Sequence, residues 1–91
     1  MNTSKQQLID FLEDYVLRPA EDHPKTNDII RRKIHGTRMR LNKLSSAETV
    51  EKYFWNAMAS EKGIDSYERL HEIDATTFED VRLEFKKLCG R

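Results

Sequence analysis

The chain has 91 residues with 16 basic and 16 acidic side chains, a length that allows one domain. Its single cysteine, Cys89, excludes an internal disulfide, and no apolar run is long enough to cross a membrane. Because the first residues are polar and do not resemble a secretory signal, we expect a soluble protein of the reducing cytoplasm.

The first helix is predicted from about Lys5 to Arg18. Ser4 is a suitable N-cap, and Gln7 completes a capping box with it. The apolar side chains of this helix fall on one arc, and they are Leu8, Ile9, Phe11, Leu12, Tyr15 and Val16. Leu17 falls outside that arc. Pro19 is expected to end the helix, because the residue before a proline avoids the helical region.

A second helix, capped by Thr26 or Asn27, is predicted over residues 27–44. Its apolar face consists of Ile30, Ile34, Leu41 and Leu44. Gly36 lies in the middle of this segment, where a glycine costs about 1 kcal/mol relative to alanine. The glycine is consistent with a kink, with a break into two helices, or with a close helix–helix crossing.

Ser45 and Glu48 form another predicted capping box, which begins a third helix that extends to about Lys62. Its apolar stripe consists of Ala47, Val50, Phe54, Ala57 and Met58. Trp55 lies well outside the stripe. We expect this helix, with Phe54 and Trp55, to be the central one of the bundle.

Two further capping boxes, Asp65 with Glu68 and Thr76 with Glu79, predict a short fourth helix and a final helix. The final helix has apolar residues at helical spacing, namely Phe78, Val81, Phe85 and Leu88. The expected fold is therefore all-α, a compact single-domain bundle of four to five helices, one of them short, that spans residues 1–91.

No set of residues in the chain has a catalytic or metal-binding spacing. His23, His35 and His71 are far apart in different elements, and no glycine-rich loop is present to hold a phosphate. Cys89 ends an apolar stripe, which favours a packed or frayed cysteine over a reactive one. We therefore expect a protein that is not an enzyme, with no catalytic residues, no cofactor, no metal ion and no small-molecule substrate.

The strongest functional signal is the charge of the second helix, since residues 25–43 hold seven basic side chains and one acidic one. The candidate contact residues in the helix are Arg31, Arg32, Lys33, Arg38, Arg40 and Lys43. Such a density of cations suits phosphates or an acidic protein, but the same residues are also consistent with pairing inside the bundle or with solvation. A helix-turn-helix at residues 44–50 is disfavoured, because Glu48 and Glu51 would face phosphates.

Four apolar residues outside the main stripes are candidates for a protein interface, namely Trp55, Leu83, Leu17 and Met39. The alternative is that some of them are core residues of helices that are packed on two sides. We predict a non-enzymatic helical interaction module, an adaptor, regulator or inhibitor that acts through protein–protein contacts, either with another protein or with a second copy of itself as a homodimer. The alternative function is a nucleic-acid-binding accessory protein that uses the basic helix at residues 27–44.

Overall fold

The computed structural model describes residues 3–24, 26–58 and 75–90, and every regular element within them is helical. This confirms the expected all-α fold. The elements in chain order are α1 (Lys5–Leu12), the π-helical turn η1 (Glu13–Leu17), α2 (Arg18–Asp22), α3 (Asp28–Lys43), α4 (Ala47–Tyr53), the π-helical turn η2 (Phe54–Met58) and α6 (Ala75–Leu88). None of these helices is long and apolar enough to cross a membrane. The predicted short helix with its Asp65 cap lies outside the described residues.

The N-terminal helix does not end at Pro19, so that prediction was wrong. The elements α1, η1 and α2 follow one another without a break and form one rod, which begins with the predicted capping box of Ser4 and Gln7. In η1 the backbone N–H of Arg18 bonds to the carbonyl of Glu13, one residue further back than in an α-helix. Pro19 then sits in the first turn of α2, where its missing N–H is tolerated.

The same π-helical turn explains why Leu17 lies in the core rather than outside the apolar arc. In an unbroken α-helix, Leu17 would lie on the side opposite Leu8. The extra residue in the turn rotates the rest of the rod, so that Val16, Leu17 and Ala20 continue the buried stripe begun by Leu8. Leu17 is only 1% exposed, which corrects the sequence prediction.

The second helix, α3, is continuous through Gly36. The side chain of Asn27 caps it by accepting the N–H of Ile30 at 3.0 Å, as one of the two predicted caps. A Cβ at Gly36 would meet no atom within 4 Å. The glycine therefore marks neither a break nor a close crossing inside the molecule.

Neither α4 nor α6 begins where its predicted capping box places it. Ser46 rather than Ser45 caps α4, in a reciprocal box with Thr49. The helix α6 already includes Ala75, so Thr76 lies in its first turn and is not its cap. In α4 the hydroxyl of Ser46 caps the helix in place of that of Ser45, and in α6 the helix starts before Thr76. The sequence pattern does not resolve the end of a helix to within one or two residues.

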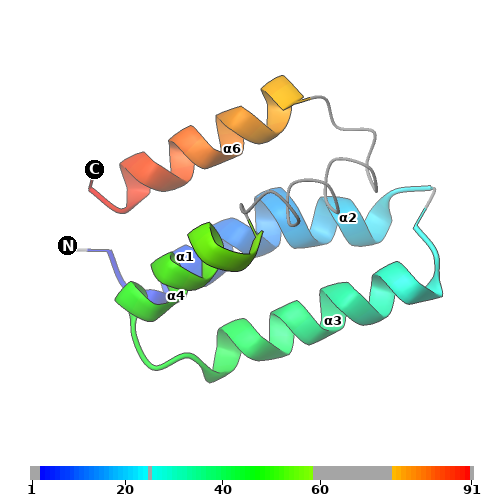
Figure 1. Cartoon of the computed structure of the whole chain (residues 1–91), viewed down its shortest axis with the longest axis horizontal. Coiled ribbons are helices and arrows are strands. Elements are labelled where there is room, and N and C mark those ends of the chain that lie inside the picture. The colour runs from blue at the N-terminus through cyan, green and yellow to red at the C-terminus, as the bar shows by residue number, and fades with distance from the viewer. Residues whose placement is uncertain (1–2, 25, 59–74, 91) are drawn as a thin grey trace.

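The rod of α1, η1 and α2 is the central element, in place of the predicted third helix. It contacts α3, α4 and α6, and Figure 1 shows α3 and α6 on opposite sides of it. The largest fully buried side chains come from the rod, α3, α4, η2 and α6, and they are Phe54, Phe85, Leu8, Leu12, Leu17, Ile34, Leu41, Met58 and Val50. The hydroxyl of Thr3 donates to the carbonyl of Leu88, so the first and last described segments lie side by side.

Candidate interaction surface

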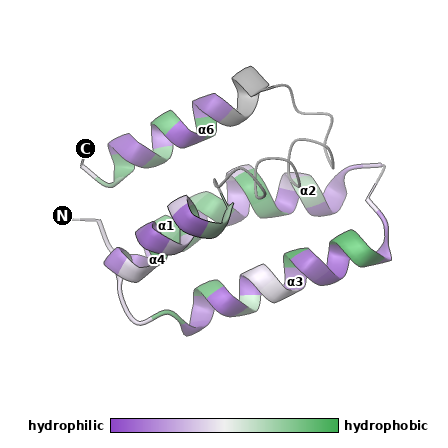
Figure 2. Ribbon diagram, viewed as in Figure 1, coloured by the Kyte–Doolittle hydropathy of each residue, from purple (hydrophilic) through white to green (hydrophobic). Residues whose placement is uncertain are grey.

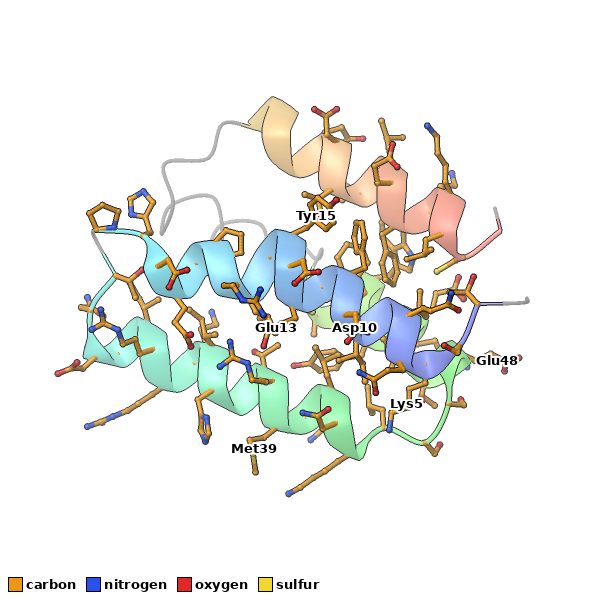
Figure 3. The ribbon with its side chains drawn as sticks, turned by 180° about the vertical axis from the view of Figure 1, so that it is seen from behind. Lys5, Asp10, Glu13, Tyr15, Met39 and Glu48 are labelled. Atoms are coloured by element: carbon orange, nitrogen blue, oxygen red, sulfur yellow. The ribbon has the colours of Figure 1, made fainter. Side chains whose placement is uncertain are left out.

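Arg38 of α3 turns towards the central rod and pairs with two of its carboxylates. Its Nε and Nη2 atoms donate to the two carboxylate oxygens of Glu13, at 2.6 and 3.0 Å, and its Nη1 atom donates to Glu21 at 3.0 Å. Figure 3 shows Glu13 on the side of the rod that faces α3. The hydrogen bond to Glu13, followed by that to Glu21, raises the pKa of Arg38 above its ordinary value.

This network changes the role assigned to Arg38. The sequence placed it with five other cations as a contact for nucleic acid or an acidic partner. Its side chain is instead 28% exposed and bonded to two carboxylates of the same chain, so that it joins α3 to the rod. Of the alternatives open for these cations, pairing inside the bundle is the one observed for Arg38.

We define the outer face of α3 as Ile29, Arg32, Gly36, Met39 and Lys43. Successive members are alternately three and four residues apart, so they form one line along the helix. All five are exposed, with Ile29 at 77% and Met39 at 47%. Figure 3 shows Met39 pointing away from the central rod.

The buried residues of α3 lie on the other side of this helix. Ile34 and Leu41 are fully buried and Thr37 is nearly so, and all three fall between the positions of the outer face. In Figure 2, α3 is largely hydrophilic, with short hydrophobic stretches between the polar ones. Within the described structure, α3 therefore packs through one side only, and its outer face is exposed.

Cations dominate the charge around the outer face. Lys33 and Arg40 are exposed along one of its edges, beside Arg32 and Lys43 of the face itself. The only carboxylate of α3 is that of Asp28 at its N-terminus, 3.6 Å from Arg31. The outer face therefore presents a positive potential to any approaching molecule.

The predicted apolar interface residues do not form one surface. Leu17 is in the core, as described above. Trp55 is half-buried, with its ring centroid 4.9 Å from that of Phe54 and 5.9 Å from the guanidinium carbon of Arg82. Leu83 is 48% exposed, but it lies on α6, on the far side of the rod from Met39.

Two open grooves border α6 in the described part of the chain. One, of about 490 Å³, lies between α4 and the end of α6 and is lined by Glu48, Glu51, Lys52, Trp55, Asn56, Cys89 and Gly90. The other, of about 420 Å³, is lined by Phe11, Tyr15, Glu84, Lys87 and Leu88. Neither lining includes a histidine, serine or threonine that would pair with a nucleophile or act as one. Cys89 is 4% exposed, in agreement with its prediction as a packed residue.

No cluster of three or more His, Cys, Asp or Glu residues is placed to hold a metal ion among residues 3–24, 26–58 and 75–90. Sequence reasoning missed Ile29 as part of the surface and gave Gly36 only structural explanations. The signal for both was available, since they share the three-and-four spacing of Met39 on the side opposite the apolar stripe of α3.

Comparison with protein families, with curated proteins and with solved structures finds no match to this chain. The feature that combines exposure, charge and a regular geometry is the outer face of α3.

Proposed function

We propose that this protein is a non-enzymatic interaction module that binds an acidic protein partner through the outer face of α3. The observation that carries the proposal is the combination of exposed apolar and cationic side chains in one line. Ile29 and Met39 alternate with Arg32 and Lys43, and the opposite side of the helix is already packed. A partner with carboxylates and apolar side chains complements both properties.

The apolar members favour a protein over a nucleic acid. Full burial of a side chain such as isoleucine or methionine stabilises a complex by about 1.5–3 kcal/mol, and a phosphate backbone offers no apolar surface for this. Nucleic acid remains the second candidate function. It is favoured by the density of exposed cations on α3, namely Arg31, Arg32, Lys33, Arg40 and Lys43.

A second copy of the chain is disfavoured as the occupant of this face. Two outer faces packed together would bring Arg32, Arg40 and Lys43 of one copy towards the same cations of the other. Like charges in such an interface weaken association. A partner of different, acidic sequence has no such penalty.

Fluorescence anisotropy tests the proposal with three labelled probes, a random glutamate–leucine copolymer, duplex DNA and RNA, at low and at moderate salt. We expect the copolymer to bind more tightly than either nucleic acid. Reversal of two charges on the outer surface of α3, by Arg32→Glu with Arg40→Glu, should weaken that binding by at least about tenfold.

The matched control reverses two charges on α6, by Lys86→Glu with Lys87→Glu, and should leave binding within about twofold of wild type. No copolymer binding at low salt, or the same loss in both double variants, would refute the role of α3. Tighter binding of DNA or RNA, lost in the α3 variant and steeply salt-dependent, would establish the second candidate instead.

A further inference from the structure

The geometry of the outer face points to the form of the partner, and this inference rests on the proposed function. We propose that the partner segment is a single acidic amphipathic α-helix that lies along α3 and approaches it most closely at Gly36. The inference follows from the spacing of the outer face, from the exposed glycine at its middle, and from the distribution of charge at its edges.

The spacing is the one that pairs of α-helices use. Residues that alternate three and four apart form the seam of a two-helix contact, because they stay on one side of a slightly supercoiled helix. In α3 this line runs from Ile29 through Gly36 to Lys43, almost the full length of the 16-residue helix. At 1.5 Å per residue the seam is about 20 Å long, enough for about four turns of a partner helix.

Gly36 occupies the centre of the seam without a structural reason inside the molecule. A Cβ there would meet no atom within 4 Å, and glycine lowers the stability of an exposed helix. A glycine does allow another backbone to approach closely, which a side chain at the same position would prevent. Close contact with the backbone of a partner helix at this position explains why the residue is a glycine.

The charges fix the chemistry of the partner helix. Lys33 and Arg40 lie at one edge of the seam, one heptad apart, and Arg32 and Lys43 lie within it. The other edge holds Asp28, His35 and Asn42 and has no fixed positive charge. A complementary helix therefore has apolar side chains against Ile29 and Met39, and has Glu or Asp at the positions that meet the basic edge.

The experiment uses two stapled helical peptides of about three heptads with identical composition. In the first, leucines form a seam at alternating spacings of three and four, and glutamates flank it. In the second, the same residues are shuffled so that no seam exists, while the staple keeps it helical. Titration of each labelled peptide with the full chain gives the two affinities.

We expect the seamed peptide to bind at least about tenfold more tightly than the shuffled one. Gly36→Phe should raise the thermal midpoint of the free protein or leave it unchanged, yet weaken the seamed peptide by at least about tenfold. Lys86→Phe, an equally bulky change on α6, is the control and should leave that affinity within about twofold.

Equal binding of both peptides, or an unchanged affinity in Gly36→Phe, would overturn the helical partner while leaving an acidic partner for α3 in place. Absence of binding for both peptides and for the glutamate–leucine copolymer would overturn the proposed function as well. The two failures are therefore distinguishable.

Discussion

Arg38 and Glu13 form a two-point ion pair between α3 and the π-helical turn of the central rod. The Nε–Oε1 and Nη2–Oε2 distances are 2.6 and 3.0 Å, and the two side chains are 28% and 23% exposed. Because η1 precedes Pro19, the pair also holds the rod at the point where its winding changes. The most basic helix of the chain thus uses Arg38 for its attachment to the rod.

Arg38→Lys is expected to lower the free energy of unfolding by about 1–2 kcal/mol, because an ammonium cannot make the parallel pair to Glu13 and also reach Glu21. Urea denaturation followed by circular dichroism measures this change. Arg32→Lys on the outer face is the control and should change stability by less than about 0.5 kcal/mol. Equal effects of the two variants would mean that the network does not stabilise the fold.

The raised pKa of Arg38 predicts how this difference depends on pH. A group whose pKa is raised in the folded state stabilises the fold below its unfolded pKa, and the contribution is lost only as the pH rises through the folded one. Arginine already titrates far above neutrality. The stability difference between wild type and Arg38→Met should therefore stay constant between about pH 6 and pH 9, and a fall within that interval would contradict the assignment.

Leu17→Ala should destabilise the protein by about 2–5 kcal/mol, since Leu17 is 1% exposed and its truncation leaves a cavity. Leu83→Ala is the matched control, because Leu83 is 48% exposed on another helix and its truncation should cost less than about 1 kcal/mol. The comparison uses thermal or urea denaturation. Similar losses in both variants would show that the π-helical turn does not carry Leu17 into the core.

Gly36→Ala should stabilise the free protein by about 0.5–1 kcal/mol, because alanine is the better helix former and its Cβ enters open space. The midpoint of urea unfolding reports the change. Thr37→Ala tests the opposite side of the same helix. Thr37 is 8% exposed and bonds to the Lys33 carbonyl at 3.0 Å, so that variant should not gain stability in the same way. Destabilisation by Gly36→Ala would show that the outer face is not open.

Phe85→Leu should lower the free energy of unfolding by about 1–2 kcal/mol, since the ring of Phe85 lies 4.1 Å from that of Phe54 and 6.1 Å from that of Trp55 between their centroids. The same variant should shift the fluorescence emission of Trp55 to longer wavelength as its apolar surroundings loosen. Lys86→Leu, one position along α6, should change neither quantity appreciably. An unshifted emission in Phe85→Leu would argue against the packing of α6 on η2.

The helical elements were readable from the sequence because their signals are local. The Ser4 capping box and the Asn27 cap depend on residues three positions apart, and the apolar stripe of α3 recurs at helical spacing within one segment. The spacing of Ile29, Gly36 and Met39 is just as local, but the sequence prediction did not group these three residues into one line. Their use in binding stays a prediction for the experiments above.

Only the tertiary structure decided how these elements are wound and which side chains make contacts between them. The sequence determined an all-helical chain with a basic helix, because periodicity and charge are properties of neighbouring residues. It did not determine the π-helical turn before Pro19, since burial of Leu17 against other helices offsets the cost of the irregular winding. It also did not separate Arg38 from the other cations of α3, because its partners Glu13 and Glu21 are brought to it only when the rod and α3 pack together.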